Sequence, residues 1–130
     1  MQISVPTSLG ELLDKIAILE IKAERIVDPA KRANVETELT ELNATYAGIP
    51  ELNADARARL ADPIARLKAV NQRLWDIEDD IRLCEKAGDF GQRFIVLARS
   101  VYKENDERAR VKREINVAFG SRLVEEKSYA

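Results

Sequence analysis

Two long stretches of the sequence carry apolar residues at alternating spacings of three and four, the pattern that most limits how this chain can fold. They cover residues 64–84 and 90–119, and a short connection from Gly88 to Gly91 separates them. This spacing places the apolar side chains of each stretch along one face of an α-helix. Helices that continue from these stretches to the stops at Gly88 and Gly120 would be roughly 35 to 45 Å long, at about 1.5 Å per residue. We therefore predict an elongated molecule built on an antiparallel helical hairpin.

Two shorter helices are predicted before this hairpin. Ser8 followed by Glu11 is a capping box, and apolar residues at helical spacing continue the first helix to near Val27. Asp28–Pro29 combines an N-cap residue with a proline at the first helical position, and it starts a second helix that ends near Gly48. Because the second helix has only one narrow apolar stripe, we expect it to cover the others.

The remaining segments complete a single all-α domain over residues 1–130. A short helical stretch begins near Ala54, and Asp62–Pro63 either starts or kinks the helix that follows. Gln2–Val5 and Arg122–Val124 are predicted to be short extended arms. The predicted fold is thus an elongated antiparallel helical bundle with an extended arm at each end.

The balance of charge and the apolar runs narrow the classes of partner. Lysine and arginine number 21 and aspartate and glutamate 23, so the net charge of -2 argues against nucleic acid or an anionic membrane as the main partner. No apolar run approaches the ~20 residues that a membrane-spanning helix needs. The start at Met1–Pro6 has no secretory leader, and Cys84 is the only cysteine. These features predict a cytoplasmic protein.

The chain contains no histidine, which excludes a large part of known enzyme chemistry. Ser-His-Asp and Cys-His catalysis, histidine-ligated zinc and the di-iron sites of helical bundles all require it. A glycine-rich phosphate loop is also missing. We expect no cofactor and no metal site. Any catalysis would depend on carboxylates, Lys, Arg, Tyr or Cys84, so the sequence leaves open whether the protein is an enzyme.

Polar residues interrupt the apolar stripes of three predicted helices. On the last helix, three of them lie at spacings of three and four between Val101 and Ile115, and therefore share one face. The first helix adds Asp14 and several cations beside its apolar stripe. The candidate site residues are Lys15, Lys22, Asn71, Glu78, Asn105, Arg108 and Lys112. If the three helices pack together, these side chains form a charged layer between apolar ends.

This layer has two main interpretations. In a structural layer, Glu78 pairs with Arg108 or Lys112 and the asparagines fix the helix register. In a binding site, the Arg, Lys and Asn donors hold a carboxylate or phosphate, with Glu78 as a candidate acid or base. A simpler variant has both cations reaching solvent. The cations of residues 99–113 are interleaved with acids, which indicates an ion-paired helix rather than a nucleic-acid surface.

Three blocks of the sequence resemble a family of small bacterial proteins described only as a domain of unknown function. They are residues 8–16, the run Trp75–Asp79, and residues 97–113, and the tail at 120–129 adds to the likeness. The resemblance covers nearly the whole chain and implies a single domain of bacterial cytosolic origin. It implies no catalytic residues, so it does not identify an activity.

The predicted function follows from the fold and from the missing catalytic groups. Two long apolar stripes exceed what the shorter helices can cover, which favours coiled-coil-like packing between copies in a homodimer. We therefore predict a non-enzymatic binding or assembly module that self-associates, with a further protein partner as another option. The alternative is a small enzyme or sensor that binds an anionic metabolite through Asn105, Arg108 and Lys112.

Overall fold

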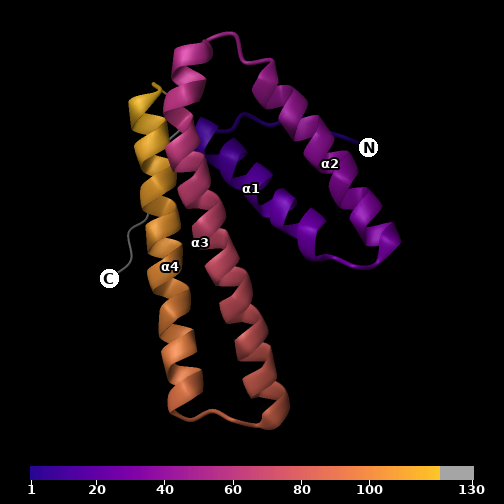
Figure 1. Cartoon of the computed structure of the whole chain (residues 1–130), viewed down its shortest axis with the longest axis vertical. Coiled ribbons are helices and arrows are strands. Elements are labelled where there is room, and N and C mark those ends of the chain that lie inside the picture. The colour runs from indigo at the N-terminus through magenta and orange to yellow at the C-terminus, as the bar shows by residue number, and fades with distance from the viewer. Residues whose placement is uncertain (121–130) are drawn as a thin grey trace.

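A computed structural model describes residues 1–120, which fold into four helices (Figure 1). The helices are α1 (Leu9–Arg25), α2 (Pro29–Ala47), α3 (Ala54–Ala87) and α4 (Gln92–Ala118). These residues form no strand, which confirms the predicted all-α class. Residues 1–7 form a non-helical arm, whereas the arm predicted at Arg122–Val124 lies outside the described residues. None of the four helices is both long and apolar enough to cross a membrane.

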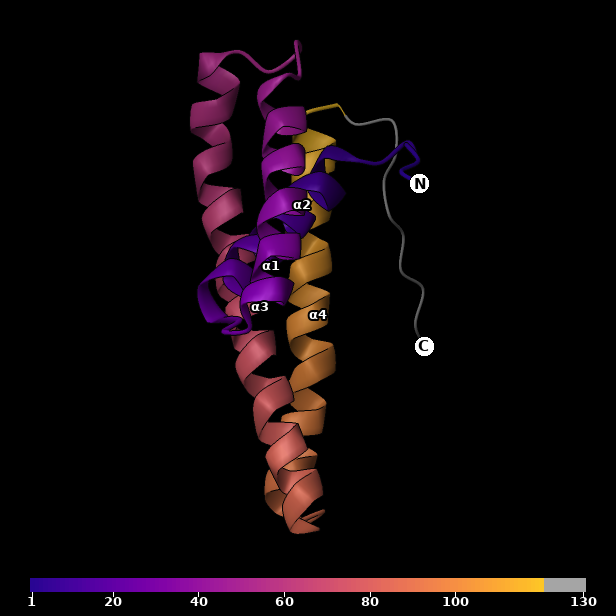
Figure 2. The same ribbon diagram turned by 90° about the vertical axis from the view of Figure 1, so that its right-hand side faces the viewer.

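The predicted antiparallel hairpin is formed by α3 and α4, which run side by side along the longest axis of the molecule (Figures 1 and 2). The two helices contain 34 and 27 residues, corresponding to lengths of about 50 and 40 Å. α3 ends at Gly88, whose φ of 66° lies in the left-handed region. Glycine is favoured there because it has no Cβ to clash with the backbone. The predicted chain reversal between Gly88 and Gly91 is therefore confirmed.

α3 is a single helix that runs through Pro63, so this proline does not begin a helix. The helix starts nine residues earlier, where the Asn53 Oδ1 atom accepts a hydrogen bond from the Ala56 amide at 2.8 Å. A proline inside a helix removes one backbone hydrogen bond. Here the neighbouring apolar residues Ala56 and Leu60 are buried, and their packing offsets that loss.

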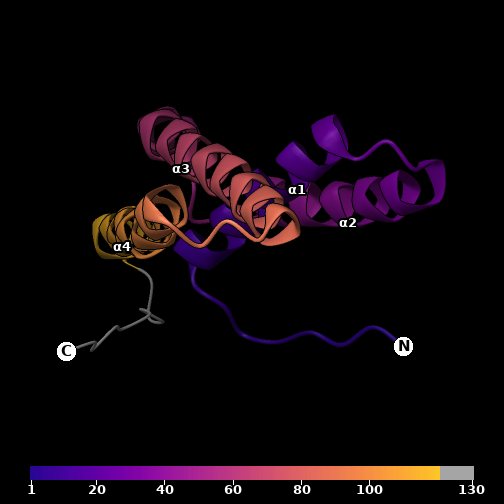
Figure 3. The ribbon, with the colours of Figure 1, turned by 90° about the horizontal axis from the view of Figure 1, so that it is seen from below.

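α1 lies between the hairpin and α2, near the open end of the hairpin (Figures 1 and 3). α2 has no buried residue, in agreement with its prediction as a covering helix. The end of α2 is tied to the start of α3 by Arg57, which donates to the carbonyl oxygens of Tyr46, Ala47 and Ile49 at 3.1 to 3.2 Å. Its guanidinium also lies 4.7 Å from the centre of the Tyr46 ring, within the range of a cation–π contact.

The apolar core lies where α1 covers the hairpin. Its least exposed side chains, all at 2% or less, include Leu13, Ile21, Leu60, Leu67 and Ile115. Beyond the contact of Arg25 with Asp76 the hairpin continues to its turn (Figure 1), and we call residues 76–103 the distal hairpin. Large apolar side chains of this segment that are 47% to 55% exposed are Leu83, Phe90, Ile95, Val96 and Tyr102. In the described part of the chain, α1 supplies a third layer only to the proximal half.

Candidate functional site

The N-terminus of α1 is fixed against α4 by a close backbone contact. The Gly10 amide donates to the Oδ1 atom of Asn116 at 2.7 Å, and a Cβ on Gly10 would lie 2.6 Å from the Lys112 carbonyl oxygen. Ser8 Oγ accepts from the Glu11 amide at 3.1 Å, which forms one half of the predicted capping box. The Glu11 carboxylate instead accepts from Lys112 Nζ at 3.1 Å. These contacts set the rotation of α1, and with it the side chains that face the hairpin.

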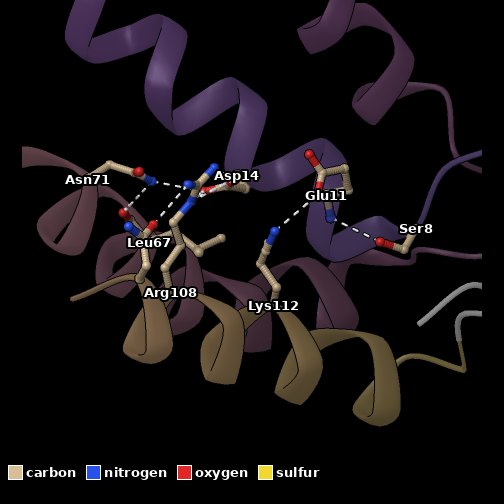
Figure 4. Close-up of polar contacts among 8 residues, drawn as sticks. Ser8, Glu11, Asp14, Leu67, Asn71, Arg108 and Lys112 are labelled. Carbon is tan, nitrogen blue, oxygen red and sulfur yellow. Dashed lines mark hydrogen bonds and ion pairs between the residues drawn. The ribbon is translucent and has the colours of Figure 1, made fainter. Parts of the chain in front are cut away.

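Asp14 is the centre of a buried polar network between α1, α3 and α4 (Figure 4). Its side chain is fully buried, and the Arg108 Nε atom donates to both of its oxygens at 2.9 and 3.0 Å. A third bond comes from Arg108 Nη2. The Asn71 amide nitrogen donates to Asp14 Oδ1 and to the Leu67 carbonyl, each at 2.9 Å. A buried carboxylate is costly without such donors, so removing one of them should destabilise the fold.

The ion pairs of the polar layer differ from those expected in the structural interpretation. Arg108 pairs with Asp14 and Lys112 pairs with Glu11, whereas Glu78 is exposed. Both acids lie at helical spacing from apolar positions, so the sequence pattern does not distinguish them. The difference comes from the rotation of α1, which turns Asp14 toward α4.

Beside this network lies a pocket of about 580 Å³ between α1, α3 and α4. Five of the seven residues predicted for a ligand site line it: Lys22, Asn71, Glu78, Asn105 and Arg108. The other two do not. Lys15 is exposed on α1, and Lys112 is buried beside Glu11. The structure thus gathers most of the predicted residues around one cavity, and their role in binding remains a proposal.

The pocket also contains residues that the sequence reasoning missed. Trp75, Asp79 and Arg82 line it, and none of the three was among the predicted site residues. A signal for two of them was present, because the positions 71, 75, 78 and 82 follow one another at spacings of four, three and four. Such residues share one face of a helix. The spacing therefore predicts that Trp75 and Arg82 lie on the same face of the helix as Asn71 and Glu78.

The wall and the rim of the pocket differ in chemistry. The apolar lining consists of Ile18, Ile21, Leu74 and Trp75. The charged rim consists of Lys22, Glu78, Asp79 and Arg82, two cations and two anions. Within residues 1–120, none of these four charged side chains forms an ion pair or a hydrogen bond.

Neighbouring charges on the same helices are paired, in contrast to this rim. Arg25 contacts Asp76 at 2.6 Å, and Lys68 contacts Glu24 at 2.6 Å. The hydrogen bond to Glu24 raises the pKa of the Lys68 ammonium, which stays protonated. These ion pairs attach the second half of α1 to α3, and so hold one edge of the pocket in place.

A metal site of the usual kind is missing from the described part of the molecule. No group of three or more His, Cys, Asp or Glu side chains within residues 1–120 is arranged to hold a metal ion. The polar chemistry of the pocket is instead that of amide, guanidinium, ammonium and carboxylate groups.

Comparison with protein families places the chain in a known group. A family described as a family of unknown function (DUF6165) matches residues 2–130. The chain belongs to this family. No match was found among curated proteins or among solved structures.

Membership confirms the resemblance that the sequence blocks indicated, and it extends over nearly the whole chain. The family description assigns no activity, so no catalytic or binding role can be transferred to this protein. A proposal for the function therefore rests on the pocket and on the distal hairpin.

Proposed function

We propose that this protein is a non-enzymatic assembly module that self-associates through the uncovered half of its hairpin. The observation that carries the proposal is an apolar surface on α4 beyond α1. It consists of Phe94, Ile95, Ala98, Val101 and Tyr102, which we call the distal α4 face. Ala98 is exposed, Ile95 and Tyr102 are 47% and 53% exposed, and the other two side chains are half-buried.

The distal α4 face continues the surface that α1 covers in the proximal half. Asn105 lines the pocket, and Val101, Ala98 and Phe94 precede it at spacings of four, three and four. Residues at these spacings share a helix face. Two helices alone cannot bury a face of this kind, and contiguous exposed apolar surface is typical of association sites. A second copy of the hairpin would supply the missing layer as a four-helix bundle.

The charges of the distal hairpin favour a second copy as the occupant. Residues 76–87 of α3 carry five acidic and two basic side chains, whereas residues 92–103 of α4 carry three basic and no acidic ones. The two segments therefore have net charges of -3 and +3. A two-fold interface can place α3 of each copy against α4 of its partner. Opposite charges then meet twice, which supports specific pairing of two identical hairpins.

Sedimentation equilibrium tests this proposal at tens of micromolar protein. We expect a reversible dimer whose Kd rises roughly tenfold or more in Ile95→Glu, a loss of about 1.4 kcal/mol. Val96→Glu is the matched control, because Val96 is similarly exposed at 51% but lies about 100° away around α4. A strict monomer, or equal weakening by both substitutions, would contradict association through this face.

Charge reversal tests the arrangement of the two copies. One variant carries Asp79→Lys and Glu85→Lys on α3, and the other carries Arg99→Glu and Lys103→Glu on α4. Within residues 1–120 these four side chains form no ion pair, so each variant should fold. We expect each variant alone to be monomeric through repulsion, and an equimolar mixture to form the heterodimer. If mixing restores nothing, α3 does not lie against the partner's α4.

A second candidate function is binding of a small anionic molecule in the pocket. The specific observation in its favour is that five of the seven residues predicted for such a site line one cavity of about 580 Å³. Cavities of this size are typical of small-ligand sites. A thermal-shift screen of anionic metabolites tests this function, since a ligand that binds only the folded state raises the melting temperature.

A further inference from the structure

We infer that the pocket binds a zwitterion with an apolar body, namely an α-amino acid with a large apolar side chain. This inference rests on the second candidate function and replaces its general anion with a defined class of ligand. Three features carry it: the apolar lining, the internal compensation of Arg108, and the balanced charges of the rim.

The apolar lining calls for a ligand with a hydrophobic group. Ile18 and Ile21 of α1 and Leu74 and Trp75 of α3 line the cavity. Burying an aliphatic or aromatic side chain between them removes apolar surface from water on both partners. A small polyanion without an apolar part would leave this lining uncovered.

The charge of Arg108 is already compensated from within the protein. Asp14 is fully buried behind it and holds its guanidinium through Nε and Nη2. The pair as a whole is neutral, so Arg108 adds polarity to the pocket but no net attraction for an anion. The charges that decide ligand choice are therefore those of the rim.

The rim carries two cations, Lys22 and Arg82, and two anions, Glu78 and Asp79. Within residues 1–120 none of them is engaged by another side chain, although the nearby charges Arg25 and Lys68 are paired. A polyanion would meet two uncompensated carboxylates, and a polyamine would meet two cations. An α-amino acid presents one carboxylate and one ammonium group side by side, so it can pair with both signs at once.

The single tryptophan of the chain provides the readout, because Trp75 lines the pocket. Three probes share a phenyl ring on a two-carbon chain and differ in the charged groups they carry: phenylalanine has both an ammonium and a carboxylate, 3-phenylpropionate only the carboxylate and 2-phenylethylamine only the ammonium. Titrations of the full chain are followed by Trp75 fluorescence and by the indole N–H resonance. We expect phenylalanine to bind at least tenfold more tightly than either singly charged probe.

Two double variants separate the contributions of the two charges. Lys22→Gln with Arg82→Gln should weaken the binding of phenylalanine and 3-phenylpropionate but should not weaken the binding of 2-phenylethylamine. Glu78→Gln with Asp79→Asn should weaken the binding of 2-phenylethylamine but should not weaken the binding of 3-phenylpropionate. The matched control is Glu85→Gln with Lys86→Gln, whose exposed side chains lie farther along α3 and do not line the pocket. It should bind all three probes like the unchanged protein.

The possible failures are distinct. If 3-phenylpropionate binds as tightly as phenylalanine, the zwitterion inference is overturned while the anion site stands. Equal or tighter binding of 2-phenylethylamine overturns both the zwitterion and the anion. If no probe up to ten millimolar changes Trp75 in fluorescence or resonance position, the pocket is not a site for this class and the inference fails. Self-association is measured separately by sedimentation, so none of these results depends on it.

Discussion

The proximal and distal halves of the hairpin have the same helices and the same apolar spacing, but they differ in burial. In the proximal half Leu60, Leu67 and Ile115 are fully buried. In the distal half Ile95 and Tyr102 of the distal α4 face are 47% and 53% exposed. The difference is the third layer, since α1 packs only on the proximal half (Figure 1). Amphipathic helices therefore supply surfaces for a core, and whether a core forms depends on what covers them.

The largest effect should come from breaking the buried pair under α1. Arg108→Met leaves Asp14 without its cation and should lower the free energy of unfolding by about 3 to 5 kcal/mol. Adding Asp14→Asn should recover part of this loss, because an amide is less costly to bury than an unpaired carboxylate. Denaturant unfolding of the single and double variants measures both values.

Two controls make this result specific. Arg110→Met removes an exposed cation two positions along α4 and should change stability by no more than ~0.5 kcal/mol. Glu78→Gln should not rescue Arg108→Met, because Asp14 is the partner in the structure. Recovery by Glu78→Gln would contradict the observed pairing and revive the pairing that the sequence had predicted.

A comparison of leucines tests whether the exposed side of α3 in the distal hairpin is covered in solution. Leu60→Ala creates a cavity in the proximal core and should cost about 2 to 5 kcal/mol. Leu83→Ala on the same helix should change monomer stability by no more than ~0.5 kcal/mol, since that side chain is mostly in solvent. Both are measured by urea unfolding at sub-micromolar protein, where association is weak. Similar costs at the two sites would mean that the distal hairpin is covered in solution.

A comparison of glycines separates packing from backbone strain. Gly10→Ala would place a Cβ 2.6 Å from the Lys112 carbonyl oxygen and should cost about 1 to 3 kcal/mol through overpacking. Gly88→Ala meets no atom within 4 Å but holds a φ of 66°, and should cost about 1 kcal/mol. Thermal unfolding of the two variants measures which loses more stability. Asparagine tolerates the left-handed region, so Gly88→Asn should be milder than Gly10→Asn, and the opposite order would refute both explanations.

The smallest effect should come from the surface pair of Arg66 and Glu114, which are 2.7 Å apart. The hydrogen bond from Arg66 lowers the pKa of the Glu114 carboxyl below its ordinary value of 4.5. A lowered folded-state pKa stabilises the protein above that value, and the gain is lost as the pH falls through the folded-state pKa. Because both side chains are substantially exposed, Glu114→Gln should cost less than about 1 kcal/mol at neutral pH.

The pH dependence and salt dependence check this assignment. The stability difference between the unchanged protein and Glu114→Gln should shrink as the pH is lowered below 4.5, and it should also shrink at high salt. A difference that persists in acid would mean that the substitution acts through packing rather than through the ion pair.

The helices could be predicted from the sequence because capping residues and apolar spacing are local signals. Ser8, Pro29 and Gly88 mark boundaries that the structure confirms within two residues. Pro63 was ambiguous, since a proline can start a helix or be carried within one. That choice depends on the packing of the flanking residues, which a local pattern does not contain.

The site was harder to predict because it depends on how helices rotate against one another. Spacing alone placed Asn105 and Arg108 on one face, and both line the pocket. The pairing of Glu78 with Arg108 or Lys112, expected in the structural interpretation, was wrong, because the contact of Gly10 with α4 sets the rotation of α1 and brings Asp14 to Arg108. A glycine in a helix indicates that another helix can pack closely against it, but the sequence does not identify that helix.

The lack of any buried residue in α2 has a consequence for the time scale on which the fold opens. Hydrogen exchange in native proteins occurs through local openings wherever few apolar contacts must be broken. Amides of α2 should therefore exchange first and independently of the protein's overall stability. Those around Leu67 in α3 should exchange only when the whole molecule unfolds. Transient release of α2 would uncover the outer side of α1 while the hairpin, the Asp14 network and the pocket stay intact. The outer side of α1 would then be exposed only briefly, whereas the surface of the hairpin would be exposed throughout.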